Sequence, residues 1–190
     1  MSLDIDVAIR HRPMPGEEKC GDRALSWKGG DIHLIAVIDG LGHGPLAALA
    51  ADAASRYIDE HREIELGALF VGCDQALRST RGAMLTVVRI DQSTGRAWHA
   101  AIGNVETRLV GPRDVPLLTT PGIVGARPRN VQVRPFELHP NSTLILYTDG
   151  ISSRFPIERM SGRRASAIAD ELLQEHAKEH DDAGCAVIVS

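Results

Sequence analysis

Four acidic positions in this chain have the surroundings expected of metal ligands. They are Asp22, Asp39, Asp149 and the adjacent pair Asp181 and Asp182, and each stands beside a glycine or another small residue. Carboxylate oxygens are the ligands that Mg²⁺ and Mn²⁺ prefer. A single aspartate followed by glycine is also a common turn signal after a strand. Because the same context returns along the chain, we interpret these carboxylates as members of one metal site.

Two apolar runs are predicted to carry Asp39 and Asp149 to the rim of a sheet. Residues 34–39 and 144–149 have the composition of buried strands. A carboxylate cannot continue into a dry core unpaired, so we expect each strand to end at its aspartate. Glycines between Asp39 and Pro45 then allow a sharp turn, and an alanine-rich helix begins at that proline.

The other elements are predicted from hydrophobic periodicity and turn signals. Their order lacks the regular alternation of strands and helices that builds a parallel sheet. It favours an α+β fold, a layered sandwich of antiparallel sheets with the helices outside. The length suits one domain, 1–190. Further strands are expected at 4–10, 23–28, 83–90, 97–102, 105–110, 131–138 and 185–189, and helices at 45–61, 66–77 and 163–177.

The composition excludes several classes of partner. A net charge of −4 and a pI near 6.0 argue against nucleic acid or an anionic membrane as the main partner. Aromatic residues make up only 4% of the chain, so we do not expect a site that stacks on bases or sugars. The three cysteines form no CxxC pair, which indicates neither a disulfide framework nor a zinc site. No apolar run is long enough for a membrane span, and we expect a cytoplasmic monomer.

Four motifs follow one another in a characteristic order. They are Gly21-Asp22, Asp39-Gly40-Leu41-Gly42-His43-Gly44, Tyr147-Thr148-Asp149-Gly150 and Asp181-Asp182-Ala183. This order resembles the metal-dependent type-2C protein phosphatases and, within them, the bacterial SpoIIE-like branch. The resemblance runs from about residue 5 to the end of the chain. It implies a layered α-β-β-α sandwich of two antiparallel sheets.

A finer resemblance concerns the middle of the chain. Gly103-Asn104-Val105-Glu106, with Arg81-Gly82 upstream and residues 121–125 downstream, is similar to the stand-alone RsbX-type stressosome phosphatases. It implies a protein serine/threonine phosphatase that acts on phosphorylated regulatory proteins of a stress-signalling complex, the RsbR/RsbS-like scaffold or antagonist proteins. The implied chemistry is attack by a water that two ions, Mn²⁺ or Mg²⁺, activate.

The resemblance also assigns roles to individual residues. Asp39 is implied to bridge the two ions, and Asp149 and Asp181 to complete the shell of the second. Asp22 is implied to lie near the metal centre, either as a ligand or through water. Asp182 is either a ligand or the residue that holds Asp181 in place. The implied metal-binding set is therefore Asp22, Asp39, the carbonyl of Gly40, Asp149, Asp181 and, as its weakest member, Asp182.

The chain departs from the better-known eukaryotic members in three respects. Those enzymes carry a histidine directly after the Asp-Gly pair, whereas here Leu41 follows and His43 comes two positions later. His43 could protonate the leaving oxygen or could cap the helix that begins at Pro45. Arg10 and Arg12 are candidates for the early arginine that binds phosphate in that family. Gly184 stands where threonine or serine is common, which removes a supporting contact rather than a ligand.

Two other functions were weighed against hydrolysis. A strand followed by Gly40-x-Gly42 resembles the start of a dinucleotide-binding turn, but Pro45 replaces the third glycine and Asp39 places negative charge at the pyrophosphate position. The alternative is a catalytically weak phosphatase-fold binding module in the same pathway, which would be expected to lose metal carboxylates. For the phosphatase function, we expect the irregular segment 152–164 to contact the partner protein and to contribute to selectivity.

Overall fold

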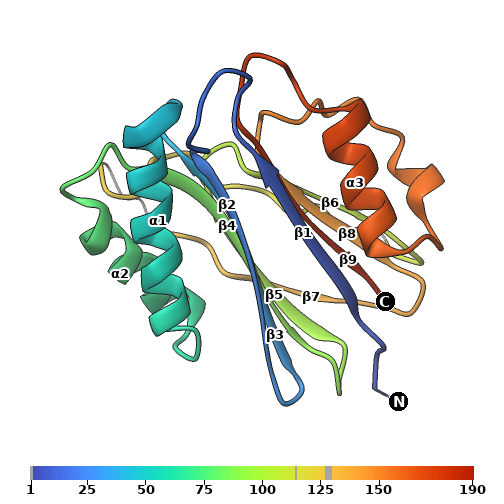
Figure 1. Ribbon diagram of the computed structural model, residues 1–190. Helices are drawn as coiled ribbons and strands as arrows, with labels where there is room; N and C mark the ends of the chain where they lie inside the picture. Colours follow the sequence, from blue (N-terminus) through green and yellow to red (C-terminus); the bar gives the residue numbers. More distant parts are fainter. Residues whose placement is uncertain (1, 114, 127–129) are drawn as a thin grey trace.

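Two antiparallel sheets form the centre of the structure, a computed structural model that describes residues 2–113, 115–126 and 130–190 (Figure 1). The strand order is β1-β9-β8-β6 in one sheet and β2-β3-β4-β5-β7 in the other. The strands are β1 (Asp6–Arg12), β2 (Asp22–Gly29), β3 (Ile32–Gly40), β4 (Ala83–Asp91), β5 (Arg96–Ile102), β6 (Glu106–Val110), β7 (Arg134–Glu137), β8 (Thr143–Tyr147) and β9 (Ala183–Val189). The helices are α1 (Gly44–Glu60), α2 (Leu66–Leu77), the short 3₁₀ helix η1 (Ile157–Met160) and α3 (Ala165–Glu175).

The helices lie outside the two sheets, which confirms the predicted α+β sandwich. In Figure 1, α1 and α2 cover the outer face of the five-stranded sheet, and α3 covers the outer face of the four-stranded sheet. Among the described residues, no helix is both long enough and apolar enough to cross a membrane.

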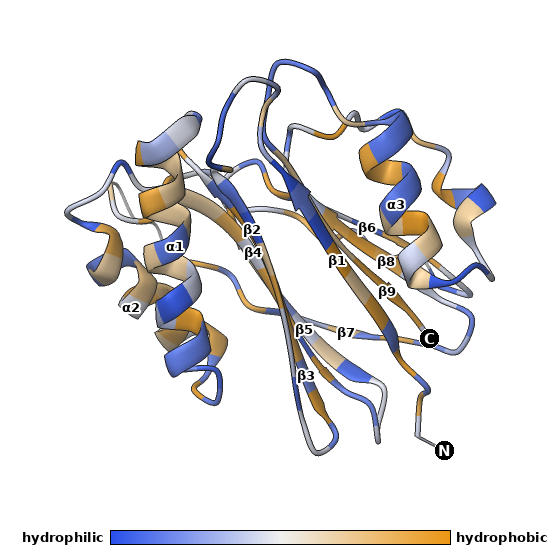
Figure 2. Ribbon diagram, in the orientation of Figure 1, coloured by the Kyte–Doolittle hydropathy of each residue, from blue (hydrophilic) through white to orange (hydrophobic). Residues whose placement is uncertain are grey.

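Each interface between layers has its own apolar core, visible as orange bands in Figure 2. The central strand β3 shows why its sequence is continuously apolar. Ala36 and Ile38 pack toward α1 and α2, whereas Ile35 and Val37 pack toward the other sheet. A strand that is buried on both faces needs apolar residues at successive positions. The small alanines of α1 allow that helix to lie close to β3.

Two predicted strand boundaries were wrong. β8 ends at Tyr147, so Asp149 lies in the turn beyond the strand rather than at its last position. The strand expected at 131–138 is shortened to β7, which pairs only with residues 96–99 of β5. Beyond that point the edge of β5 is taken by Thr120, which exchanges backbone hydrogen bonds with Ala101 and Gly103.

The segment 152–164 is more ordered than its irregular sequence indicated. It contains η1, and Phe155, Ile157 and Met160 are buried in the core beneath α3. Arg108 donates hydrogen bonds to the carbonyls of Ser153 and Phe155. The polar residues between these anchors remain exposed, so the segment presents a fixed surface rather than a loose loop.

Candidate metal centre

The predicted metal-binding aspartates gather at one edge of the sandwich, uppermost in Figure 1. The antiparallel pairing of β2 with β3 sets Asp22 directly opposite Asp39. β8 ends and β9 begins at the same edge of the neighbouring sheet, which brings the turns containing Asp149 and Asp181 to this rim. Like charges placed directly opposite each other destabilise a pair of strands. A pairing of this kind indicates that the fold retains Asp22 and Asp39 for another purpose.

The electrostatics of the rim favour a cation. Asp22 is only 2% exposed and Asp39 only 7%. Burial, as the largest cause, and the charges of neighbouring aspartates together raise the pKa of Asp22 to about 8 and that of Asp39 to about 9. Burial and the neighbouring Asp149 also raise the pKa of Asp181. Divalent cations relieve this repulsion and restore the ionised forms.

Thr148 ties three of the four motifs together. Its hydroxyl donates to Asp22 Oδ2 at 2.6 Å and accepts from the backbone N–H of Gly184 at 3.0 Å. The residue before Asp149 therefore fixes the orientation of Asp22 across the gap between the sheets. Gly184 leaves room for this contact, because a Cβ there would lie 3.1 Å from Asp22 Cβ.

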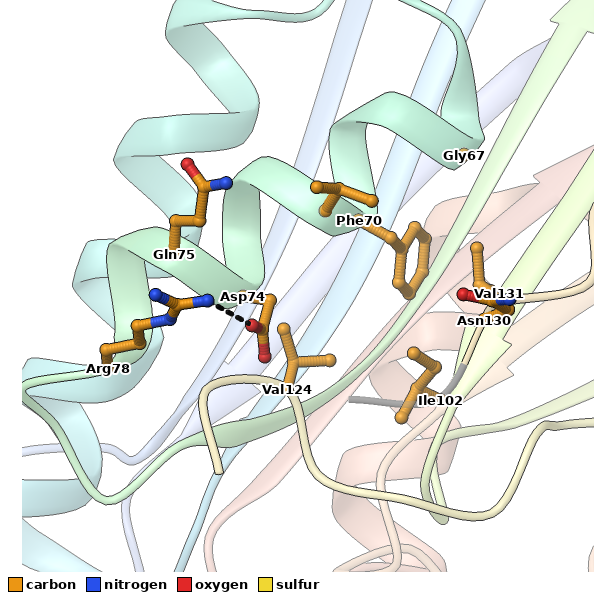
Figure 3. A pocket seen from close by; sticks show the side chains of 10 residues that line it. Gly67, Phe70, Asp74, Gln75, Arg78, Ile102, Val124, Asn130 and Val131 are labelled. Atoms are coloured by element: carbon orange, nitrogen blue, oxygen red, sulfur yellow. Dashed lines mark ion pairs between the residues drawn. The ribbon is translucent and has the colours of Figure 1, made fainter. Parts of the chain in front are cut away.

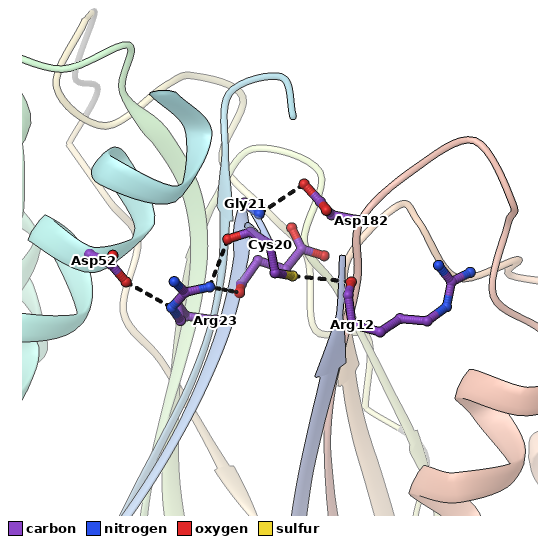
Figure 4. Close-up of polar contacts among 7 residues, drawn as sticks. Arg12, Cys20, Gly21, Arg23, Asp52 and Asp182 are labelled. Carbon is purple, nitrogen blue, oxygen red and sulfur yellow. Dashed lines mark hydrogen bonds and ion pairs between the residues drawn. The ribbon is translucent and has the colours of Figure 1, made fainter. Parts of the chain in front are cut away.

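The two aspartates of the terminal pair have different surroundings. Asp182 is buried, and its oxygens accept from the backbone N–H groups of Met14 and Gly21, each at 2.8 Å. Figure 4 shows the contact with Gly21. Asp181 is half-buried and accepts only from its neighbour's N–H, at 3.0 Å. Asp182 thus fastens the segment before β2 to the start of β9, while Asp181 keeps an oxygen available for a ligand role.

Asp149 has a partner that the sequence did not reveal. Its side chain is exposed at the rim, and Asn104 Nδ2 donates to its Oδ2 at 2.7 Å. The amide oxygen of Asn104 is buried without a hydrogen-bond partner among the described residues. From the sequence, Asn104 was recognised only as part of the family resemblance. The other carboxylate oxygen of Asp149 accepts no hydrogen bond from a described residue.

Two glycines are required by close packing around these carboxylates. A Cβ on Gly40 would overlap the carbonyl of Ala47 in α1, and a Cβ on Gly150 would overlap the carbonyl of Asp182. The glycine after each Asp is therefore needed for the approach of neighbouring backbone. At Gly40 this packing also fixes the carbonyl that was predicted to be a ligand.

His43 does not act as the side-chain cap that one reading of the sequence allowed. It occupies the N-cap position of α1, but its side chain makes no capping hydrogen bond. Its Nδ1 instead lies 3.0 Å from Glu17 Oε1, and the ring is largely exposed. Glu17 had no signal in the sequence, since it comes from the loop between β1 and β2.

The two arginines proposed for phosphate binding are both engaged elsewhere. Arg10 Nε pairs with Asp170 Oδ1 at 2.7 Å, on the side of β1 that faces α3. Arg12 Nη2 donates to the carbonyl of Lys178 at 2.7 Å, and its side chain extends away from Asp182 in Figure 4. Neither guanidinium is directed toward the rim.

Two other features lie apart from this rim. A cavity of about 400 Å³ opens beside α2, lined by Phe70, Val71, Asp74, Arg78, Ile102 and Val131 among others, and none of the rim carboxylates borders it (Figure 3). On α3, ligand atoms of Glu171, Glu175 and His176 come within 4.8 Å of one another, but Glu171 already pairs with Arg163 at 2.6 Å.

Comparisons of this sequence with known proteins point to bacterial phosphatases. The family model of Stage II sporulation protein E (SpoIIE) matches residues 29–190. The phosphoserine phosphatase RsbX of Bacillus subtilis (strain 168) is 27% identical over 140 residues, which is 72% of this chain and 70% of that protein.

Solved structures share the whole fold. A chain from a study of the bacterial stressosome as a modular system for secondary messenger signalling superimposes with a TM-score of 0.88 at 27% identity, covering 98% of this chain and 100% of that chain. RsbX in complex with magnesium gives a TM-score of 0.85 at 20% identity, covering 99% of this chain and 97% of that chain. The phosphatase domain of SpoIIE from Bacillus subtilis gives 0.83 at 18% identity, covering 100% of this chain and 64% of that chain.

Proposed function

The chain belongs to the SpoIIE family, and we propose that it removes phosphate from phosphoserine or phosphothreonine of stress-signalling proteins with the help of two divalent ions. Within that family it is a metal-dependent protein serine/threonine phosphatase, most similar to the RsbX type. The observation that carries the proposal is the buried, directly opposed pair Asp22 and Asp39, at the same rim as Asp149 and Asp181.

The residues at the rim fit a divalent metal centre. All the donor groups are oxygens, which suits Mg²⁺ or Mn²⁺. Two such ions supply a nucleophilic water at neutral pH and offset the charge of the phosphoryl group. Binding would also remove the repulsion that raises the pKa of Asp22 and Asp39. The similarity to an RsbX structure that contains magnesium supports the same type of ion.

Each side chain has a position that suits its proposed role. Asp39 faces Asp22 and is close enough to Asp149, Asp181 and Asp182 for their charges to act on it, which supports its proposed role as the bridging ligand, with the Gly40 carbonyl beside it. Asp149 and Asp181 approach from the other sheet, and in each the second carboxylate oxygen accepts no hydrogen bond from a described residue. Asp22 is held by Thr148 and contributes through its remaining oxygen or through a water. We assign Asp182 to support rather than to direct ligation.

His43 is placed to assist departure of the seryl oxygen. The contact between Nδ1 and Glu17 Oε1 orients the ring, and in the protonated ring the Nε2–H would be the group that donates a proton to the leaving oxygen. A positioned acid matters most for an alkoxide leaving group, because serine is a poor leaving group without protonation. The pair of Glu17 and His43 stands at the turn that follows Asp39.

The substrate is proposed to be a phosphate carried on a folded protein of a stress-signalling complex in the cytoplasm. The rim is the exposed edge of the sandwich rather than a closed pocket, so a phosphorylated loop can reach it. The described rim residues include no aromatic platform for a nucleobase. The similarity to RsbX and to a chain from a stressosome study supports the choice of partner. The alternative, a catalytically weak binding module, is disfavoured because every predicted metal carboxylate is present.

Hydrolysis by the purified protein tests the proposal. Turnover of phosphoserine scaffold proteins should require Mn²⁺ or Mg²⁺, stop with chelator, and disappear in Asp39→Asn and Asp149→Asn. The kcat/KM on these proteins should exceed that on nucleotides and sugar phosphates measured under the same conditions. Activity that survives chelation would contradict the metal mechanism, and a preference for a small metabolite would contradict the substrate class.

A further inference from the structure

A cationic side chain stands beside the proposed metal centre without a role in it. Arg81 is exposed, immediately before β4, and it makes no hydrogen bond or ion pair with any described residue. The pairing of Gly40 with Ala83 continues into the turn, so Arg81 comes level with Gly42. A Cβ on Gly42 would meet Arg81 Nη1 at 3.1 Å. The guanidinium therefore lies against the turn that follows Asp39.

That turn is itself part of the rim. The carbonyl oxygen of Gly42 lies 3.5 Å from the position that a Cβ on Gly21 would occupy, and the N–H of Gly21 donates to Asp182. Arg81 is thus next to the backbone that borders the carboxylates. Arg81 therefore lies against the turn between Asp39 and α1, and it forms no ion pair with any described carboxylate.

The backbone that carries Arg81 is firmly held. Gly82 has a φ of +86°, and its carbonyl accepts from the N–H of Leu41 at 3.1 Å. The next residue, Ala83, exchanges two backbone hydrogen bonds with Val124. The loop around Val124 is fixed in turn by the buried Asp74, which accepts from the N–H of Gly125 at 2.7 Å. The backbone position from which the Arg81 side chain extends is therefore fixed next to the turn that follows Asp39.

Other cations near the rim already have partners. Arg23 Nε pairs with Asp52 at 2.8 Å and its Nη1 donates to the carbonyl of Cys20 at 2.7 Å (Figure 4). Arg10 and Arg12 are engaged on the α3 side. Among the described arginines, Arg81 is the one placed against the turn that follows Asp39, and its five donors make no hydrogen bond or ion pair with a described residue.

We propose that Arg81 binds the phosphoryl oxygens of the phosphoprotein substrate and of the phosphate product. The inference rests on the proposed function and adds to it the group that recognises the phosphate. Arginine presents a planar fork that matches two phosphoryl oxygens, and its hydrogen bonds to an anion are stronger than neutral ones. The carboxylates of the rim repel a phosphate dianion, and a cationic side chain at this edge would offset part of that repulsion.

The test compares Arg81→Ala, Arg81→Lys and the control Arg56→Ala. Arg56 is also an exposed arginine, but it lies on the outer part of α1, about 18 Å along the helix from its first residue. With Mn²⁺ present, Arg81→Ala should raise KM for a phosphoserine protein and the inhibition constant of inorganic phosphate by about 10-fold or more. Arg81→Lys should recover part of this loss, and Arg56→Ala should leave both values unchanged.

Thermal melting separates phosphate binding from metal binding and folding. The Mn²⁺-induced rise in Tm should be the same in wild type and Arg81→Ala. Unchanged phosphate inhibition and KM in a folded Arg81→Ala protein would overturn the inference. If wild type shows no metal-dependent hydrolysis, the proposed function fails, and calorimetric titration of inorganic phosphate into the Mn²⁺-loaded proteins still decides the role of Arg81. Equal phosphate affinity in wild type and Arg81→Ala would then refute it.

Discussion

Replacing Asp39 with asparagine should stabilise the metal-free protein while abolishing its response to metal. Burial raises the pKa of Asp39 from 3.8 to about 9, and the facing charge of Asp22 adds to the shift. A carboxyl whose folded pKa exceeds its unfolded pKa makes the folded state bind more protons. Stability of the metal-free protein therefore falls as pH rises from about 4 to about 9. At pH 8 most of this loss of stability has developed in the wild-type protein, whereas asparagine does not titrate and causes no such loss.

The magnitude follows from the same pKa. A pKa unit corresponds to about 1.4 kcal/mol, so the shift sets an upper limit of about 6 kcal/mol at pH 8. Water entry and relaxation at the rim reduce the penalty, and we expect Asp39→Asn to gain about 1–3 kcal/mol. For a domain of this length the gain corresponds to a rise in Tm of roughly 3–10 °C.

Thermal melting in chelator at pH 8 and pH 5 measures the effect. The advantage of Asp39→Asn should shrink at pH 5, where less of the penalty has developed. Wild type should gain about 2.7 kcal/mol when free Mn²⁺ reaches 100 times its Kd, whereas Asp39→Asn should gain nothing. Asp59→Asn is the control, because Asp59 is an exposed partner of Arg62 and its loss should change stability by less than about 0.5 kcal/mol. An Asp39→Asn protein that melts below wild type at pH 8 in chelator would refute the reasoning.

Three further outcomes are expected. Asp181→Asn should lose more activity than Asp182→Asn, and the reverse order would reverse the roles assigned to the two residues. Asp182→Asn should instead lower the free energy of unfolding by about 1.5–3 kcal/mol, because it weakens two charged hydrogen bonds. Asn104→Ala should weaken Mn²⁺ binding, measured by calorimetry, by about 10-fold, because Asn104 orients the proposed ligand Asp149. Asp149→Asn, which changes the ligand itself, should weaken the binding further. His43→Ala should slow hydrolysis of a phosphoserine peptide more than that of an aryl phosphate, whose leaving group needs no acid, and equal effects on both would exclude the proton-donor role.

The sequence predicted the strands that lead to the rim better than the hydrogen bonds that join residues there. β3 and β8 were foreseen because an apolar run followed by Asp-Gly has a local physical meaning. The position of Asp149 was misjudged by two residues, since Thr148 leaves the strand to hydrogen-bond with Asp22. That contact joins residues 126 positions apart. A contact of this separation depends on how the two sheets pack and leaves no periodic signal in the chain.

The same limit applies to the supporting residues. Asn104 lies 45 positions from Asp149, and Glu17 lies 26 positions from His43. Arg10 and Arg12 were plausible phosphate ligands by type and position, but the side of β1 on which each lies directs them to α3 and to a backbone carbonyl. Residue type thus indicated the chemistry, and only packing decided which residue performs it.

The proposed metal centre would also have a structural consequence, because its proposed ligands come from both sheets. Asp22 and Asp39 belong to the five-stranded sheet. Asp149 lies just after β8 and Asp181 just before β9, both strands of the four-stranded sheet. Without an ion, the described polar contacts across this edge are few, with Thr148 to Asp22 and Asp182 to Gly21 the principal ones. A pair of ions held by carboxylates from both sides would fasten the sheets at the edge where their charges otherwise push them apart. If the proposed ligands bind the ions, the same residues that prepare the site for phosphate would make the stability of the sandwich depend on the metal.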